Sequence, residues 1–194
     1  MPRIMIWLAL LLWAGSPPNA SKYSGPKCLG PFCIDHAVPT RTLFKQLGPP
    51  APRASPLSPY CYRSQDGTIF LYIDTIGPEP GVSGAVFLSD FANCVHMRSQ
   101  ATTDDLRTWT TREGVKIGSS EDDVIKAYGK PSSENKVDAQ TIRFAIRGYR
   151  TTDKVQMIAE KMMLYNDAAG DDLSAAEFGV RNGKVSFIWL SHNE

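Results

Sequence analysis

Between residues 114 and 131 the chain reads GVKIGSSEDDVIKAYGKP, and the order of polar and apolar positions there predicts a short helix. Ser120 and Asp123 have the spacing of a capping box. Val124 and Tyr128, four residues apart, share one helix face. Gly129 is expected to end the helix with a positive, left-handed φ, and the proline after it forbids continuation. Because so short a helix is unstable alone, the pattern predicts that it packs against an apolar surface.

A fainter copy of this pattern lies earlier in the chain. Residues 38–50, VPTRTLFKQLGPP, align with residues 119–131 at a shift of 81 positions. Leu43 then falls on Val124, and Gly48 falls on Gly129. Coincidence is the alternative, since Gly-x-Pro is common punctuation after a helix. Against it, strand-like segments follow both copies in the same order.

Those segments predict antiparallel sheet in both halves. Residues 69–74 resemble 162–167, and residues 85–90 resemble 187–192. The Asn-Gly pair in RNGK (181–184) is typical of a two-residue hairpin turn. The expected fold is α+β, with two related modules, each a short capped helix packed on an antiparallel β-sheet. The expected boundaries are residues 21–98 and 112–194.

A helix that ends in Tyr-Gly-x-Pro, follows Gly-x-x-x-Gly and precedes antiparallel strands resembles two families. These are the β-lactamase inhibitory protein and the small outer-membrane assembly lipoproteins of the SmpA/OmlA type. Tandem duplication is the pattern of the former. This chain differs from the lipoproteins because it has no lipobox cysteine. It differs from the inhibitor because its cysteines are confined to the first half. The resemblance implies a shared fold and a binding role.

Residues 1–20 are expected to be a signal peptide. Arg3 precedes the apolar run IMIWLALLLWAG (4–15), which is short for a membrane span. Cleavage predicts a periplasmic or secreted protein with no membrane attachment, and an uncleaved anchor is the alternative. With 21 basic and 20 acidic side chains, net charge does not favour nucleic acid or an anionic membrane as a partner.

Four cysteines in an exported chain predict two disulfides. The favoured pairing joins Cys28 to Cys33 and Cys61 to Cys94. Cys61 aligns with Ile142 of the second copy, and alternation from Leu88 places Cys94 on the inward side of the first sheet as well. A zinc site is the alternative, but the spacing lacks pairs of close Cys-x-x-Cys knuckles.

No motif in the chain points to catalysis. The three histidines (His36, His96 and His192) lack metal-ligand spacing, and no phosphate loop or dinucleotide fingerprint is present. Calcium binding by Asp167, Asp171 and Asp172 is an alternative, although their spacing differs from an EF-hand loop. The expectation is a protein without enzymatic activity, cofactor or metal. A small exported hydrolase remains the alternative.

Alternation along the strands predicts a recognition surface. Val86, Leu88, Ile188 and Leu190 should face the helices, which leaves large rings on the opposite side. Exposed aromatic rings are candidate hot spots for binding another protein in the envelope or outside the cell. An enzyme inhibitor and an envelope-assembly accessory protein are two forms of this function, and burial of the rings by other parts of the chain is the alternative. The predicted partner-binding residues are Phe70, Tyr72, Phe87, Phe187 and Trp189.

Overall fold

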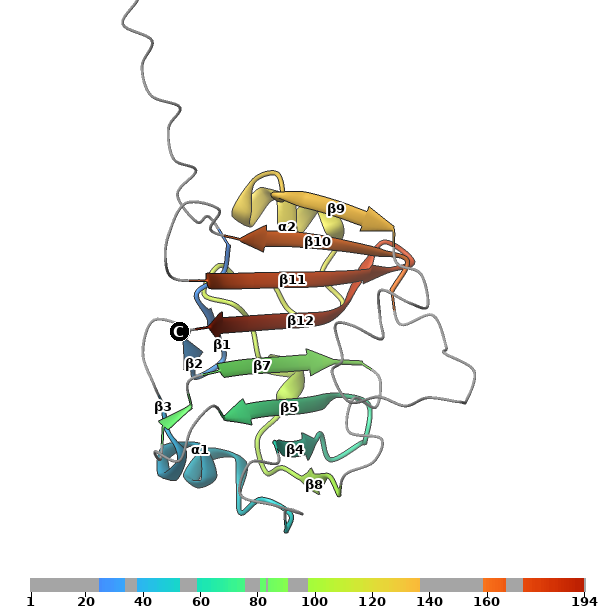
Figure 1. Ribbon diagram of the computed structural model, residues 1–194. Helices are drawn as coiled ribbons and strands as arrows, with labels where there is room; N and C mark the ends of the chain where they lie inside the picture. Colours follow the sequence, from blue (N-terminus) through green and yellow to red (C-terminus); the bar gives the residue numbers. More distant parts are fainter. Residues whose placement is uncertain are drawn as a thin grey trace, which may run out of the picture.

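The computed structural model describes residues 25–33, 38–52, 59–75, 81–82, 84–90, 98–136, 159–166 and 173–193. These residues form a predominantly β structure, in which one large mixed sheet is accompanied by two α-helices and two small two-stranded sheets (Figure 1). The α+β expectation is confirmed at this coarse level. The signal peptide expected at residues 1–20 lies outside the described residues, and the division at 21–98 and 112–194 stays a prediction.

The large sheet has eight strands in the order β8-β4-β5-β7-β12-β11-β10-β9. β7 and β12 are therefore the two central strands, and the two edge strands, β8 and β9, are both short. All neighbours are antiparallel except β4 and β8, which run parallel. The bounds are β4 Tyr60–Arg63, β5 Phe70–Thr75, β7 Gly84–Ser89, β8 Gln100–Ala101, β9 Ser133–Lys136, β10 Lys161–Asn166, β11 Leu173–Arg181 and β12 Lys184–Asn193.

Two helices, a 3₁₀ turn and a hairpin pack against one face of this sheet, and in Figure 1 α2 lies behind the strands. We call this the helix face and the opposite side the outer face. A further small sheet pairs β3 with β6. The bounds of these elements are α1 Thr40–Leu47, α2 Glu121–Tyr128, η1 Leu106–Thr108, β1 Cys28–Leu29, β2 Phe32–Cys33, β3 Val38–Pro39 and β6 Gly81–Val82.

The start of α2 confirms the predicted capping box. The Ser120 hydroxyl accepts from the Asp123 amide at 3.1 Å, and the Asp123 carboxylate accepts from the Ser120 amide at 2.8 Å. Both bonds satisfy amides that the start of the helix leaves free. The Ser120 hydroxyl also donates to the Asp123 carboxylate at 2.7 Å, and this bond, followed by the one from the Ser120 amide, lowers the pKa of Asp123.

The predicted glycines end both helices at positive φ. Gly48 has φ 87° and ψ 174°, and Gly129 has φ 76° and ψ −163°. These ψ values differ from the expected left-handed helical conformation and fall in an extended region that essentially only glycine adopts. A tyrosine donates to each glycine carbonyl, Tyr62 to Gly48 at 3.1 Å and Tyr165 to Gly129 at 3.0 Å. The sheet thereby fixes the end of both helices in the same way.

The RNGK segment forms the predicted hairpin turn between β11 and β12. Arg181 pairs with Lys184, while Asn182 and Gly183 have φ of 51° and 68°. Two consecutive positive φ angles match the twist of the flanking strands, which is why Asn-Gly suits this position.

The main core lies between the sheet and the helix face. Leu43 and Leu47 of α1 and Val124 and Tyr128 of α2 pack in one cluster with inward strand residues. That cluster includes the four aliphatic residues expected to face inward, so the predicted parity of β7 and β12 is confirmed: Val86, Leu88, Ile188 and Leu190.

The expected orientation of Cys61 is wrong. Tyr60 and Tyr62 occupy the inward positions of β4 in the main core, so alternation turns Cys61 to the outer face, opposite Tyr72. The register of β4 decided this, because a shift of one residue exchanges the two faces of a strand.

Candidate functional site: the outer face of the sheet

The five predicted rings lie together on the outer face of three adjacent strands. Tyr72 of β5 is directly opposite Phe87 of β7, which is directly opposite Trp189 of β12. Phe70 and Phe187 occupy the next outer positions, on either side of Ser89. The alternation in the sequence therefore placed these rings on the correct face.

Two of the rings are buried. Phe87 is 6% exposed and Phe187 is 4% exposed, and they stack with centroids 5.1 Å apart and planes at 27°. Ala159 and Met162 complete this cluster, which is separate from the main core. Burial by other parts of the chain, the alternative noted from the sequence, thus applies to Phe87 and Phe187.

Gly179 of β11 explains how Phe187 is held. A Cβ atom at this glycine would lie 2.0 Å from the nearest atom of the Phe187 ring. The two residues are direct cross-strand partners, so the ring lies flat over the space that the missing side chain leaves. A small residue at this position is required for Phe187 to reach the cluster.

The other three rings are only partly buried. Tyr72 and Trp189 pack against the Phe87–Phe187 cluster from its two sides, and Phe70 is also half-buried. Rigid rings that are supported from beneath and still reach solvent are the kind of side chain that anchors protein interfaces. Within the predicted set, Phe70, Tyr72 and Trp189 are therefore the residues available for direct contact.

Glu177 of β11 extends this row and was not anticipated from the sequence. It lies directly opposite Trp189 on one side and Leu164 on the other. Its Oε2 atom is buried without a hydrogen-bond partner. Burial raises the pKa of Glu177 to about 7, because the charged form loses hydration. The signal in the sequence was the alternation of Ala175, Glu177 and Gly179, which sets one acid between two small residues on one face.

A second carboxylate lies at the end of β7. Asp90 accepts from Arg181 at 2.7 Å through Oδ2, while its Oδ1 is buried without a hydrogen-bond partner. Burial raises the pKa of Asp90, and the Arg181 charge partly opposes that effect. The pair joins the end of β7 to β11 across β12, which accounts for it by its contacts between strands.

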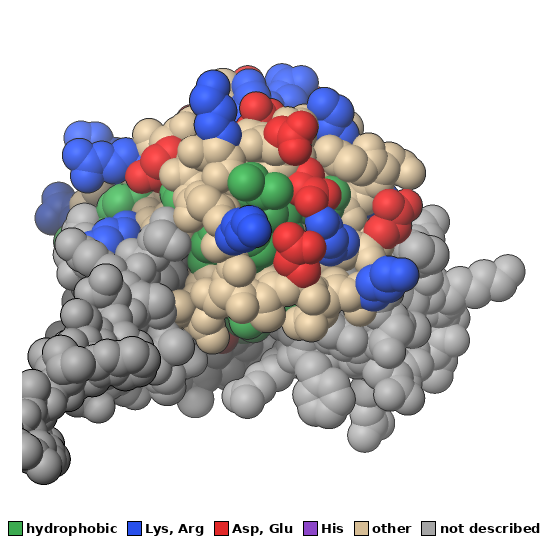
Figure 2. Space-filling view, turned by 90° about the horizontal axis from the view of Figure 1, so that it is seen from above, with side chains coloured by type: hydrophobic (Ala, Val, Ile, Leu, Met, Phe, Trp, Pro, Cys, Tyr) green, Lys and Arg blue, Asp and Glu red, His purple; other side chains and the backbone are tan. Residues whose placement is uncertain are grey.

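Charged side chains of both signs surround a small hydrophobic patch on the side of β9 and α2, seen from above in Figure 2. Lys161 bridges Glu121 of α2 and Glu134 of β9. Charged side chains on an edge strand oppose pairing with a strand of another molecule. This edge is therefore a poor candidate for binding by strand addition.

An open pocket of about 530 Å³ lies beside the β1–β2 hairpin. One Asp104 oxygen in its wall accepts from Gln46 and from the Trp109 indole, both at 2.8 Å. The Trp109 ring also packs against Gly30, where a Cβ would lie 2.7 Å from it. These contacts connect α1, the hairpin and the residues on both sides of η1. The wall of the pocket is therefore accounted for by contacts between these elements.

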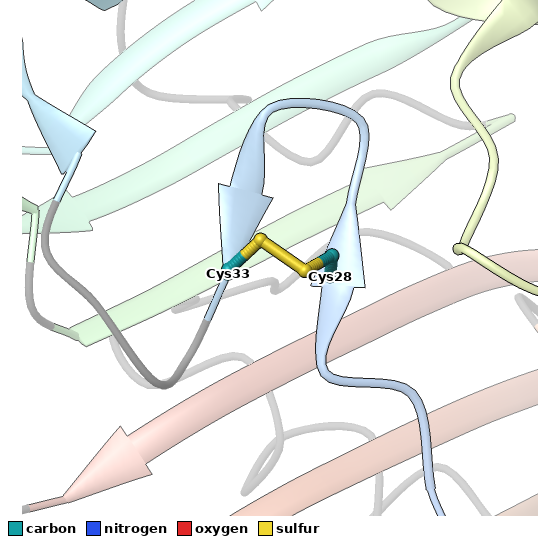
Figure 3. Close-up of a disulfide and its surroundings, with 2 residues drawn as sticks. All are labelled: Cys28 and Cys33. Atoms are coloured by element: carbon teal, nitrogen blue, oxygen red, sulfur yellow. A yellow bond between two sulfur atoms is a disulfide. The ribbon is translucent and has the colours of Figure 1, made fainter.

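Cys28 and Cys33 form the predicted disulfide across β1 and β2 (Figure 3). Cys61 is also disulfide-bonded, and Cys94, its expected partner, lies outside the described residues. The Cys61–Cys94 pairing therefore stays a prediction. Among the described residues no cysteine is free.

The described residues hold no group of three or more potential metal ligands among His, Cys, Asp and Glu. His36 and His96 lie outside these residues, as do the acids considered for calcium binding, Asp167, Asp171 and Asp172. No helix in the described part of the chain is long and apolar enough to cross a membrane.

No family model matches this chain, and neither a curated protein nor a solved structure matches it significantly.

Proposed function

We propose that this protein binds another protein in the periplasm or outside the cell, through the outer face of its sheet and without catalysis. The observation that carries the proposal is the row formed by Tyr72, Phe87 and Trp189 across β5, β7 and β12. Its central ring is buried, and the two flanking rings are partly exposed. This arrangement provides preorganised apolar contacts, which reduce the entropy lost on binding.

The position of the helices supports the proposal. Both helices contribute to the core on the helix face, so α1 and α2 do not compete with a partner for the outer face. The Cys28–Cys33 disulfide is compatible with export, because disulfides persist in oxidising compartments. Loss of the expected signal peptide at residues 1–20 would release the chain from the membrane.

We also propose that the fold is built from two related modules, in keeping with the resemblance to the β-lactamase inhibitory protein and the SmpA/OmlA type. The strand order supports this, since β4 and β10 are each third from the centre of the sheet. Tyr62 of β4 and Tyr165 of β10 make the same bond to a helix-ending glycine. On this proposal β4 would be the counterpart of β10, whereas the sequence resemblance paired residues 69–74 with residues 162–167.

The test is capture of proteins from an envelope and secreted fraction by the purified protein, followed by affinity measurement for the captured protein. Trp189→Ala and Tyr72→Ala should each weaken binding by about 30-fold or more, the effect of losing an aromatic anchor worth about 2 kcal/mol. The matched controls are Lys45→Ala and Lys126→Ala, exposed positions on the two helices. Loss of binding in the helix variants alone would contradict the proposal.

The identity of the captured protein distinguishes the two forms of the function. A single secreted or periplasmic enzyme whose activity falls on binding supports an inhibitor. An envelope complex that forms only in the presence of this protein supports the assembly role. An activity of the chain itself that survives Trp189→Ala but is lost with one polar residue would instead support the hydrolase alternative.

A further inference from the structure

The outer face contains one feature that apolar contacts do not explain, the carboxylate of Glu177. Its Oε2 atom is enclosed and accepts no hydrogen bond, although its direct cross-strand neighbours, Trp189 and Leu164, are large apolar side chains. An acid without a partner is costly in such surroundings, since burial penalises the charged form. A residue of the same shape without a charge would pack here at lower cost.

The cations described nearby are engaged elsewhere. Arg181, on the same strand, pairs with Asp90, and Lys161 points to the helix face, where it bridges Glu121 and Glu134. Arg63 on β4 lies four strands away from β11, opposite Phe70. Within the described residues, Glu177 thus has an aromatic cross-strand neighbour, Trp189, and its Oε2 atom has no hydrogen-bond partner.

We propose that Glu177 and Trp189 together receive a lysine or arginine side chain of the partner protein. A cation is drawn to the face of an indole ring and to a carboxylate by the same electrostatics, and both attractions strengthen as water is excluded. The row of rings would bury the apolar stem of that side chain, and the carboxylate would neutralise its charge. This inference rests on the proposed function, because it specifies the chemistry of the partner at the same face.

The ionisation of Glu177 supplies a distinctive readout. Its pKa of about 7 means that the free protein carries this charge only in part at neutral pH. Among the described residues, charged groups near this part of the outer face include Arg181 paired with Asp90, Glu160 beside β10, which accepts from the Asn182 amide, Asp74 on β5 and Arg63 on β4. The strands flanking Glu177 present Trp189 and Leu164 directly opposite it. Binding of a cation requires the ionised form, so affinity should rise about tenfold from about pH 6 to about pH 8, as the competent fraction grows.

The experiment is selection of a random displayed peptide library on the purified protein, with affinities of the enriched peptides measured against Glu177→Gln and Trp189→Ala. We expect peptides that bind the outer face to contain a lysine or arginine. Their affinity should fall at least tenfold with either variant, and equally when the basic residue is replaced by the neutral norleucine. Asp122→Asn, an equal charge change on exposed α2, should leave affinity unchanged.

The outcomes separate this inference from the proposed function. Peptides that are lost with Trp189→Ala but bind Glu177→Gln unchanged would overturn the cation site and leave the protein-binding face in place. Selection that yields no peptide sensitive to Trp189→Ala would overturn both. Peptides that require Glu177 and a basic residue, with affinity that rises through about pH 7, would support both.

Discussion

Replacing Glu177 by glutamine should stabilise the protein in neutral and alkaline solution while changing little in acid. Burial raises the pKa of this carboxyl in the folded chain from 4.5 to about 7, whereas the unfolded chain exposes it to water. A carboxyl whose pKa is raised on folding makes its full contribution to the stability of the folded chain only below the pKa that it has in the unfolded chain. That contribution is lost as the pH rises through the folded pKa, since a proton must then leave a buried group.

The size of the effect follows from the difference between the two pKa values. Going from 4.5 to about 7 spans about 2.5 units, or about 3 kcal/mol at 1.36 kcal/mol per unit. Glu177 is half-buried, so solvent screening reduces this upper limit to about 1–3 kcal/mol. Glutamine keeps the shape of the side chain and never ionises. The free energy of unfolding of the Glu177→Gln variant, relative to that of the parent chain, should therefore rise by about 1–3 kcal/mol between about pH 4 and about pH 8.

Urea unfolding of both chains at one-unit pH intervals measures this directly, with the parent chain subtracted at each pH so that other ionisable groups cancel. Asp122→Asn serves as the control, because this exposed acid of α2 removes the same charge from the helix face. A stability difference for Glu177→Gln that stays constant within about 0.5 kcal/mol over this range would show that the carboxylate is hydrated and refute the reasoning.

Three further predictions concern stability and covalent structure. Gly179→Ala should cost about 1–3 kcal/mol and lower the melting temperature by several degrees, since a Cβ there lies 2.0 Å from the Phe187 ring; an unchanged melt would mean that the ring does not occupy this space. Gly129→Val should cost more than about 1 kcal/mol through backbone strain alone, because no atom lies within 4 Å of the added Cβ. Gly129→Asn should be destabilising as well, and a neutral asparagine variant would instead indicate a left-handed helical stop. Peptide mapping without reduction should find Cys61 linked to Cys94, and any other linkage excludes that pairing.

Local patterns determined the elements of this protein. The capping box at Ser120, the helix-ending glycines and the Asn182-Gly183 turn were all predictable, because each depends on the backbone preferences of a few adjacent residues. Alternation likewise placed Leu88 and Ile188 toward the helices, since both strands are long enough for the period of two to be read. Residues that form the main core on these strands could therefore be predicted from the sequence.

Tertiary structure decided what local patterns leave open. The register of the short strand β4 turned Cys61 outward, and no pattern of four residues specifies register by itself. Whether the outer rings are exposed also depended on distant segments: Phe187 is buried because Gly179 of the next strand leaves room for it and Met162 lies one strand further on. The unusual state of Glu177 arises only when Trp189 and Leu164 are brought to either side of it. A pKa reflects the solvation and charges around a group in space, and the sequence order of neighbours does not contain that information.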